Sequence, residues 1–208
     1  MSERVELVGE MAGVVQHIEH IKEIVAMQQS YAKVFGLMEP VPPTALVQDA
    51  LRMNAAAFER HGVRVIQQFD ENAPPVLVDR HKALQILINL LRNAKYALDE
   101  QAPPERRLEI HVSQLTAGNV AITVRDNGIG IAPENLTRIF GHGFTTKKDG
   151  HGFGLHSGAL AAKQMNGSLS VHSDGPGQGA TFTLELPVAP SADVQSRADS
   201  KAMAVASN

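Results

Sequence analysis

Apolar residues near the start of the chain recur at the spacing of a helix. Between residues 3 and 34 they stand three or four positions apart, at Val8, Met11, Val15, Ile18, Ile21 and Val25. Spacing of this kind places apolar side chains on one face of a helix. We therefore predict a long helical segment within residues 1–38 whose apolar stripe packs in a helical bundle. Prolines at positions 40, 42 and 43 interrupt the chain after it.

Shorter elements are predicted in the middle of the chain. Thr44 is the expected N-cap of a second helix, which runs through Phe58 and ends at Gly62. Residues 63–66 and 76–78 have strand composition and lie on either side of a Pro-Pro turn. Asp79 is the expected cap of the next helix, whose core face comprises Leu84, Leu87, Ile88, Leu91, Ala94 and Leu98.

The second half of the chain is richer in strands. Residues 108–112 and 120–124 alternate between polar and apolar positions, which predicts neighbouring antiparallel strands. A helix over about 155–165 follows a glycine-rich region, and two last strands are expected at 168–172 and 180–186. Helices and strands do not alternate one to one, and the strands pair mostly as hairpins. This order predicts an α+β fold, with helices on one face of a mixed, mostly antiparallel sheet, and argues against a doubly wound dinucleotide-binding fold.

Composition narrows the class of protein. The 208 residues are 43% hydrophobic and 20% charged, which suggests one globular domain with attachments, and residues 189–208 are read as a disordered tail. No apolar run approaches the ~18 residues of a membrane span, and the first residues lack the pattern of a signal peptide. Cysteine is absent, which excludes disulfides and thiolate metal sites and fits a cytoplasmic location. A net charge of −3 and an aromatic content of 4% do not favour nucleic acid as a partner.

The first motif with candidate chemistry lies on the helix after Asp79. Asn89, Asn93 and Tyr96 are four and three residues apart, so their side chains share one face, whereas Lys95 points elsewhere. Two amide oxygens on one face can ligate a hard cation such as Mg²⁺. The alternative is that both Asn residues only cap or bridge a polar surface.

Two glycine-rich motifs follow. Residues 126–131 read Asp-Asn-Gly-Ile-Gly-Ile directly after a strand, where the Asp126 carboxylate can accept a hydrogen bond from an exocyclic amine such as that of adenine. The alternative is a simple Asp-Asn-Gly turn. Residues 150–155 read Gly-His-Gly-Phe-Gly-Leu before a helix, a pattern that leaves backbone N–H groups free for phosphate oxygens. This second motif is neither a Walker sequence nor a Rossmann fingerprint.

In this order the motifs closely resemble the nucleotide-binding boxes of the GHKL superfamily, the Bergerat-fold ATPases and kinases. Residues 89–96 resemble the N box, and residues 126–130, 150–155 and 177–182 resemble the three glycine boxes. Residues 138–147, Arg-Ile-Phe-Gly-His-Gly-Phe-Thr-Thr-Lys, resemble the F box. The resemblance covers about residues 44–188 and implies a two-layer α/β sandwich that binds ATP.

The resemblance also implies roles for individual residues. Asn93 would ligate Mg²⁺, with Asn89 near the metal and the phosphates, and Asp126 would bond the adenine amine. Residues 140–151 would form a mobile lid, from which Lys147 or Lys148 would reach the phosphates. The remaining residues expected around ATP are Tyr96, Gly128, Gly130, Ile131, Phe144, Thr145, Thr146, Gly150, His151, Gly152, Phe153, Gly154, Leu155 and Thr181, the last near the adenine. The spacing of His142, His151 and His156 does not support a metal site.

Position 89 favours a kinase over a hydrolase. Hydrolases of this superfamily, such as gyrase, carry a Glu there that polarises the attacking water, and Asn89 cannot act as a base. The sequence most resembles sensor histidine kinases, in which a histidine attacks the γ-phosphate. One departure is that Tyr96 stands where many of these kinases place a lysine. A GHKL-type hydrolase or nucleotide-driven switch and a non-enzymatic nucleotide-binding regulator are the alternatives.

The phosphoacceptor histidine is not evident. His17 and His20 lie on the first predicted helix, but no proline follows them as in the family's His box. Residues 17–25 resemble instead the second helix of a dimerisation hairpin, so we expect a fragment of a longer kinase. The implied partners are a phosphoacceptor histidine domain, supplied upstream or by a partner subunit, a response regulator receiver domain and a second copy joined through the N-terminal helix. The parent protein would be cytoplasmic or anchored to a membrane upstream.

Overall fold

The computed structural model describes residues 36–115, 118–147, 150 and 152–190. Met38 opens the compact unit that contains the sheet and its helices. The helix predicted over residues 3–34, with His17 and His20, lies outside the described residues. So do residues 191–208, which make up most of the predicted tail.

Five strands form the central sheet in the order β2-β4-β5-β7-β6. Four neighbouring pairs build it: β2 runs parallel to β4, and the β4–β5, β5–β7 and β6–β7 pairs are antiparallel. Their bounds are β2 Val63–Phe69, β4 Arg106–Gln114, β5 Asn119–Asp126, β6 Ser168–His172 and β7 Ala180–Pro187. The predicted mixed, mostly antiparallel sheet is therefore confirmed, including its last hairpin.

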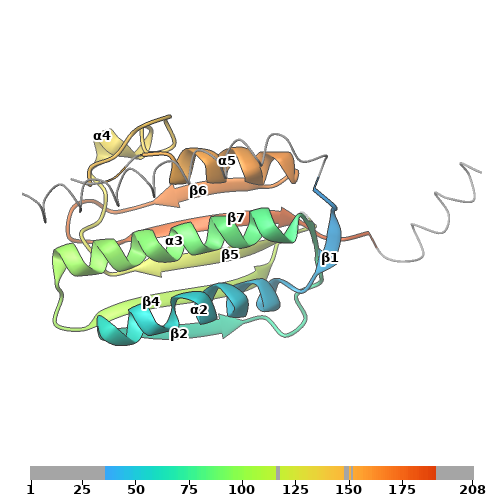
Figure 1. Cartoon of the computed structure of the whole chain (residues 1–208), viewed down its shortest axis with the longest axis horizontal. Coiled ribbons are helices and arrows are strands. Elements are labelled where there is room, and N and C mark those ends of the chain that lie inside the picture. Colours follow the sequence, from blue (N-terminus) through green and yellow to red (C-terminus); the bar gives the residue numbers. More distant parts are fainter. Residues whose placement is uncertain (1–35, 116–117, 148–149, 151, 191–208) are drawn as a thin grey trace, which may run out of the picture. The chain divides into compact units, whose positions relative to one another are not determined.

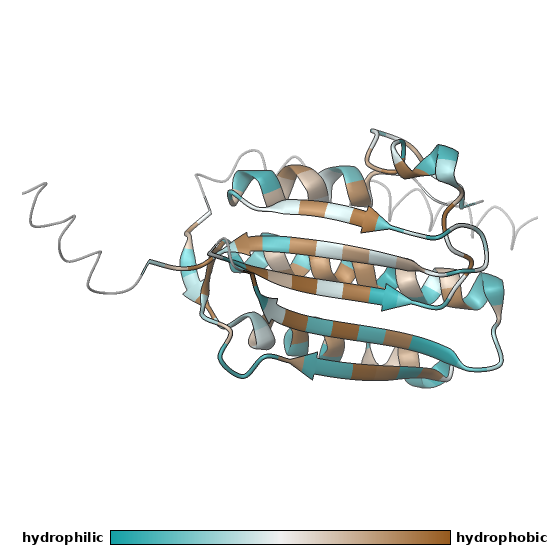
Figure 2. Ribbon diagram, turned by 180° about the vertical axis from the view of Figure 1, so that it is seen from behind, coloured by the Kyte–Doolittle hydropathy of each residue, from teal (hydrophilic) through white to brown (hydrophobic). Residues whose placement is uncertain are grey.

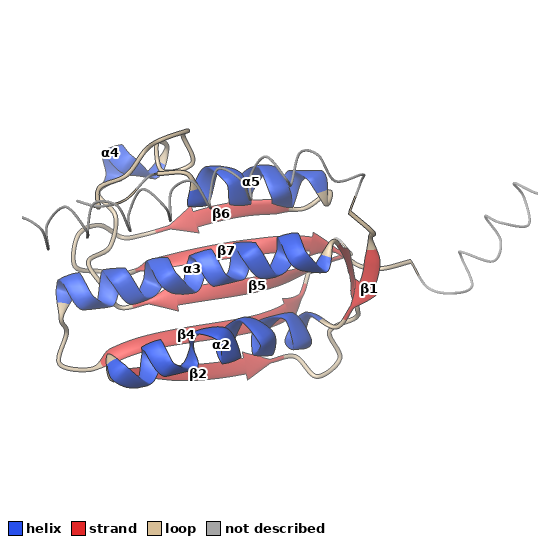
Figure 3. Cartoon of the chain, viewed as in Figure 1, coloured by secondary structure: helices blue, strands red, loops and turns tan. Residues whose placement is uncertain are grey.

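Three long helices lie against one face of this sheet (Figure 1 and Figure 3). They are α2 (Pro43–Arg60), α3 (Arg80–Gln101) and α5 (Gly154–Gln164), and a single turn, α4 (Pro133–Leu136), precedes α5. Figure 2 views the sheet from the opposite side, where hydrophilic and hydrophobic bands alternate along the strands. This is the two-layer α+β architecture predicted from the sequence. Among the described residues, none of the helices combines the length and the apolar character that crossing a membrane requires.

Helix α3 lies between α2 and α5 and contributes much of the core. Its predicted cap is confirmed, because Asp79 Oδ1 accepts hydrogen bonds from the backbone N–H groups of His81 and Lys82. The predicted core face is partly correct, since Leu84 and Ile88 are only partly buried. The residues that are buried are Ala83, Ile86, Leu87, Leu90, Leu91, Ala94 and Leu98. A helix that contacts a sheet and two flanking helices buries a wider arc than one stripe.

Before α3, one prediction is wrong and one strand was missed. The N-cap of α2 is Pro42, not Thr44, because Pro43 occupies the first helical turn, where its fixed φ fits and its missing N–H is not needed. The strand β1 (Glu39–Val41) was not predicted, and it pairs with β3 (Val76–Val78) as a separate two-stranded ribbon. A proline at position 40 suits such a short ribbon better than the interior of a sheet.

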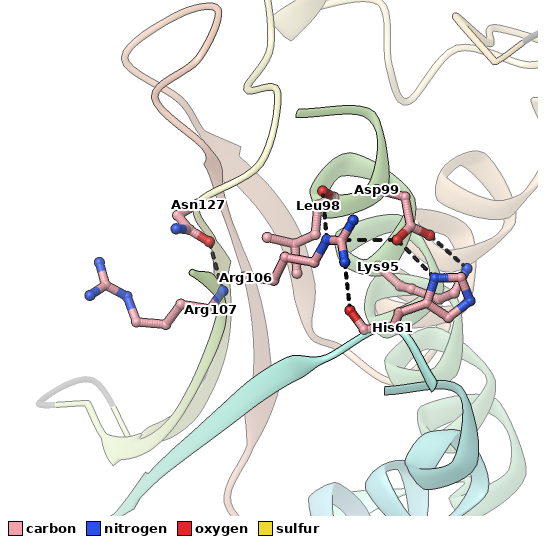
Figure 4. A network of polar contacts seen from close by, with 7 residues as sticks. All are labelled: His61, Lys95, Leu98, Asp99, Arg106, Arg107 and Asn127. Carbon is pink, nitrogen blue, oxygen red and sulfur yellow. Dashed lines mark hydrogen bonds and ion pairs between the residues drawn. The ribbon is translucent and has the colours of Figure 1, made fainter. Parts of the chain in front are cut away.

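An ion-pair network fixes the C-terminal end of α3 (Figure 4). Asp99 lies 2.9 Å from both Lys95 Nζ and His61 Nδ1, and Arg106 Nη1 donates to the backbone oxygen of His61 at 2.8 Å. Burial alone would raise the pKa of the Asp99 carboxyl, but hydrogen bonds from Lys95 and His61 hold that pKa below its usual value. The network joins α2, α3 and the start of β4, and it turns Lys95 toward α2.

Candidate functional site

The N box and the second glycine box meet where α3 passes the start of α5. Asn89 and Asn93 lie one turn apart on α3 and are both partly exposed. A Cβ added to Gly154 would overlap the side-chain amide of Asn89, so this amide lies directly against the first residue of α5. The structure thus brings the N box and the second glycine box into direct contact.

The end of the F box lies on the same face of α3. Lys147 Nζ donates to Asn93 Oδ1 at 2.6 Å and stands 4.6 Å from the centre of the Tyr96 ring. Burial, and secondarily the charge of Lys95, lowers the pKa of the Lys147 ammonium. An ammonium group at Asn93 Oδ1 indicates that this amide oxygen can receive a cation.

Metal binding at this site would rest on amide and phosphate oxygens. In the part of the chain that the structure describes, no group of three or more His, Cys, Asp or Glu residues is placed to hold a metal ion. Mg²⁺ needs few protein ligands when a nucleotide supplies phosphate oxygens. The Asn93 amide oxygen fits the role of such a ligand, and Asn89 lies one turn away.

Asp126 ends β5 as a buried carboxyl group, with an exposed fraction of only 4%. Its Oδ1 accepts a hydrogen bond from the Gly128 backbone N–H at 2.9 Å, and the Ala180 backbone N–H supplies a second one. Burial raises the pKa of this carboxyl to about 6, against the two hydrogen bonds, which lower it. Asp126 is therefore a hydrogen-bond acceptor that burial has removed from water, which makes its charged form less favourable.

The backbone after Asp126 is clamped between α3 and the third glycine box. The Ile129 N–H donates to the Ala97 oxygen at 3.1 Å, and a Cβ on Gly128 would overlap the backbone of Ala97. From the other side, the N–H groups of Gly177 and Gly179 donate to the Ile129 and Gly128 oxygens at 2.6 and 3.1 Å. These contacts fix the position of Asp126 relative to the C-terminal turns of α3.

The second glycine box opens α5 without a side-chain cap. Phe153 occupies the N-cap position and makes no capping hydrogen bond. Its ring lies 4.8 Å from that of His142, while His156 Nδ1 bonds the Phe140 oxygen at 2.9 Å. The F box is thereby attached to the first turn of α5, whose uncapped N–H groups suit phosphate oxygens.

The other expected F-box and glycine-box residues surround this contact. The Lys147 N–H donates to Thr145 Oγ1 at 3.1 Å, and the Gly150 N–H donates to the Lys147 oxygen at 3.2 Å. Thr146 is exposed, and the guanidinium carbon of Arg138 lies 4.9 Å from the centre of the Phe144 ring. The Ile131 N–H donates to Ser173 Oγ, and Leu155 packs at the edge of the core. Two glycines lie close to other backbone segments, Gly152 to residues 143 and 144 and Gly130 to residue 175. His151 and Lys148 lie outside the described residues.

Thr181 is the predicted site residue that the structure separates from the rest. Ala180, not Thr181, is the partner of Asp126 in the β5–β7 register. Successive residues of a strand point to opposite faces, and Thr181 lines a shallow hollow with His111 and Arg125. The expectation that Thr181 lies beside the adenine is therefore not supported.

Sequence reasoning missed two positioning side chains. Asn127 Oδ1 accepts a hydrogen bond from the Arg107 N–H at 2.8 Å (Figure 4). Asn127 Nδ2 donates to the Glu105 oxygen, also at 2.8 Å, and the two bonds tie the first glycine box to the start of β4. Ser173 Oγ donates to the Gly179 oxygen at 2.6 Å and accepts from Ile131. A Ser and an Asn next to glycine turns are the only signals in the sequence for these contacts.

Comparisons with known proteins agree with this geometry. Residues 78–190 match the family described as histidine kinase-, DNA gyrase B- and HSP90-like ATPases. The signal transduction histidine-protein kinase AtoS of Escherichia coli (strain K12) is 31% identical over 85% of this chain and 28% of its own length. The sensor protein FixL of Bradyrhizobium diazoefficiens is 31% identical over 84% of the chain and 33% of its own length.

Solved structures show the same fold. Full-length ShkA in complex with AMPPNP has a TM-score of 0.66 at 26% identity, over 76% of this chain and 32% of that one. The nucleotide-free catalytic domain of the histidine kinase ThkA has a TM-score of 0.63 at 22% identity, over 72% of this chain and 95% of that one.

The chain thus spans about a third or less of the curated relatives AtoS and FixL, yet nearly all of a solved catalytic domain. The predicted ATP-binding domain is confirmed by the family match together with the Bergerat-type layers. The chain belongs to the family of histidine kinase-, DNA gyrase B- and HSP90-like ATPases, and it contains an ATP-binding domain of the histidine-kinase type.

Proposed function

We propose that this chain binds Mg-ATP between α3, the first glycine box and the start of α5, and presents the γ-phosphate to a histidine side chain. The observation that carries the proposal is that Asn89 and Asn93 of α3 lie beside the start of α5 and the Lys147 ammonium. The last turns of the same helix hold the glycine box that follows Asp126. One helix thereby links a cation-binding amide to a buried carboxylate acceptor.

Adenine recognition is assigned to Asp126. An ionised carboxylate accepts a hydrogen bond from the adenine amine and repels the O6 acceptor of guanine. Because Asp126 is buried, losing its partner costs more than the loss of an exposed hydrogen bond would. The site should therefore prefer ATP to GTP.

Phosphate binding is assigned to the uncapped N–H groups of Gly154 and Leu155, with Asn93 as the protein ligand of Mg²⁺. The metal, when bound, would compensate charge on the transferring phosphoryl group. Asn89 touches the first residue of α5 and supports its approach to the phosphates.

The nucleophile is proposed to be a histidine rather than water. An amide at position 89 cannot accept the proton of an attacking water, which disfavours hydrolysis. A neutral imidazole needs no such base to attack phosphorus. The names of the relatives, which are sensor histidine kinases, support a phosphoacceptor domain and a response regulator receiver domain as partners. A homodimer joined through the N-terminal segment, in a cytoplasmic or membrane-anchored parent protein, completes the proposal.

The Asp126→Asn substitution is expected to weaken ATP binding on the order of 100-fold, because the adenine amine would face an amide that also donates. Titration calorimetry with ATP and GTP measures the effect, and the exposed carboxyl group of Asp174 offers a matched control through Asp174→Asn. An ATP affinity that Asp126→Asn leaves unchanged would remove the carboxylate from the adenine pocket.

Asp126→Asn is also expected to stabilise the nucleotide-free domain relative to wild type, and this difference in the free energy of unfolding should grow as the pH rises. The folded-state pKa of Asp126, about 6, exceeds the unfolded value of 3.8, so the folded state binds the proton more tightly and loses stability as pH increases through this window. The neutral amide introduced by Asp126→Asn carries no such penalty. Between pH 5 and pH 8 the advantage of Asp126→Asn should grow by about 1–2 kcal/mol. Urea unfolding at both pH values measures it, and an advantage independent of pH would contradict the argument.

Asn93→Ala is expected to abolish the tightening of ATP binding by magnesium while leaving the melting temperature near the wild-type value. The side chain is a partly exposed cation ligand and not part of the core, which lies on the opposite side of α3. ATP affinities with Mg²⁺ and with a chelator measure the effect, and the exposed Arg92→Ala on the same helix is the control. Equal tightening in Asn93→Ala and wild type would refute the metal assignment.

Incubation with γ-labelled ATP is expected to give very slow release of phosphate and little labelling of the chain itself. The reasons are the missing base at position 89 and the missing acceptor pattern around His17 and His20. Fast release of inorganic phosphate would instead identify a hydrolase. Strong acid-labile labelling that disappears in His17→Gln or His20→Gln would place the acceptor on this chain.

A further inference from the structure

Ser173 lies at the junction of the first and third glycine boxes. It is the first residue after β6, it is partly buried, and its hydroxyl contacts the loop that follows β5. Strands β5 and β6 each pair antiparallel with β7, so both end at the same end of the sheet (Figure 1). The end of the first glycine box and the turn before β7 are therefore within reach of one side chain.

The Ser173 hydroxyl uses its whole hydrogen-bonding capacity. Its Oγ accepts from the backbone N–H groups of Ile131 at 3.0 Å and Gly175 at 3.3 Å. Its proton is closest to the Gly179 oxygen, at 2.6 Å, whereas the Gly175 oxygen lies 3.4 Å away. A serine hydroxyl offers one donor and two acceptor sites. All three are in use, so this side chain ties three backbone positions together.

The contact with Gly179 lies directly beside Asp126. The Gly179 N–H donates to the Gly128 oxygen at 3.1 Å, and a Cβ on Gly179 would overlap the backbone oxygen of Asp126. Ala180, the next residue, supplies a backbone hydrogen bond to the Asp126 carboxyl. A shift of the turn before β7 would therefore change the environment of this carboxyl.

One peptide group connects the Ser173 hydroxyl to the Asp126 carboxyl. The Gly179 oxygen and the Ala180 N–H belong to the same planar peptide, and they point in opposite directions. Ser173 binds the oxygen end, and the carboxyl binds the N–H end. A hydrogen bond accepted by the oxygen also polarises the N–H and makes it a better donor. Ser173 thus both orients and strengthens the donor that holds the carboxylate.

We propose that Ser173 is a positioning residue of the adenine subsite, whose hydroxyl directs the peptide between Gly179 and Ala180 toward the Asp126 carboxylate. The bond from Ile131 to the same hydroxyl holds the first glycine box against the turn before β7. The proposal rests on the proposed function, because it assumes that Asp126 receives the adenine amine.

Ser173→Ala removes three hydrogen bonds and is expected to weaken ATP binding roughly tenfold. The loss should be the same for ADP, because Ser173 acts on the base acceptor and not on the phosphate end of the site. Calorimetry with both nucleotides measures it. Ser170→Ala is the matched control, since it makes the same change at an exposed position of β6 and should keep the wild-type affinities.

The ionisation of Asp126 gives a readout that a general loosening of the fold would not produce. Burial raises the pKa of this carboxyl to about 6, and the hydrogen bonds from Gly128 and Ala180 oppose the rise. When the Ala180 N–H is no longer held in place, the charged form loses part of its support, so the Asp126 pKa in Ser173→Ala should exceed the wild-type value. A loosening that only admitted water would lower the pKa instead. NMR titration of the Asp126 carboxyl carbon in the nucleotide-free chain distinguishes the two.

Two further variants separate the hydroxyl from the space it fills. Ser173→Thr keeps the hydroxyl and should restore both the nucleotide affinities and the wild-type pKa of Asp126. Ser173→Cys has a similar shape but is a weak donor, so it should reproduce the loss and carries the same test where thermal melting shows that Ser173→Ala is not folded.

An Asp126 pKa that stays the same or falls in Ser173→Ala would overturn the proposal, and so would a loss of affinity confined to ATP. A loss in Ser173→Thr as large as that in Ser173→Ala would also overturn it, because the hydroxyl would then have no special part. A wild-type chain that binds neither ATP nor ADP would overturn the proposed function instead. The titration of Asp126 needs no nucleotide, so the two failures are distinguishable.

Discussion

The site depends on keeping one carboxyl group, Asp126, ionisable inside the domain. Burial disfavours its charge, and the surrounding backbone offsets this only in part, through the N–H groups of Gly128 and Ala180. Gly128 lies so close to the Ala97 backbone that a Cβ there would overlap it, and Ala180 is placed beside Asp126 by the β5–β7 pairing. The backbone held between α3 and the third glycine box thus supports the buried Asp126 carboxylate. This carboxylate can still accept a hydrogen bond from a ligand that donates one.

The two sides of helix α3 have different roles, one in packing and the other in the site. Leu87, Leu90 and Leu91 pack into the core and fix the helix against the sheet. The opposite side carries Asn89 and Asn93, whose positions are therefore as rigid as the core itself. The proposed cation ligand lies on α3 and the proposed base acceptor at the end of β5, and the hydrogen bond from the Ile129 N–H to the Ala97 oxygen holds these two elements together.

The sequence predicted what is local and missed much of what is distant. The Asp79 cap, β6, β7 and α5 follow from short-range patterns, and the structure confirms them. Period-two alternation identifies strands but not their partners, so the parallel pairing of β2 with β4 and the β1–β3 ribbon were not foreseen. Thr181 was assigned by motif position, and the strand register placed Ala180 opposite Asp126 instead.

Lys147 shows why residue-by-residue transfer of a motif has a physical limit. A motif assigns a charge to a position in the sequence, whereas a phosphate responds only to where the charge lies in space. In this chain Lys95 forms an ion pair with Asp99, and the ring of Tyr96 contacts the ammonium group of Lys147 from the F box. Tyr96 of the N box and Lys147 of the F box are far apart along the chain but meet beside Asn93. A substitution in the N box of such a domain is best interpreted together with the charge carried by the F box, because both segments contribute to the potential at the same oxygen.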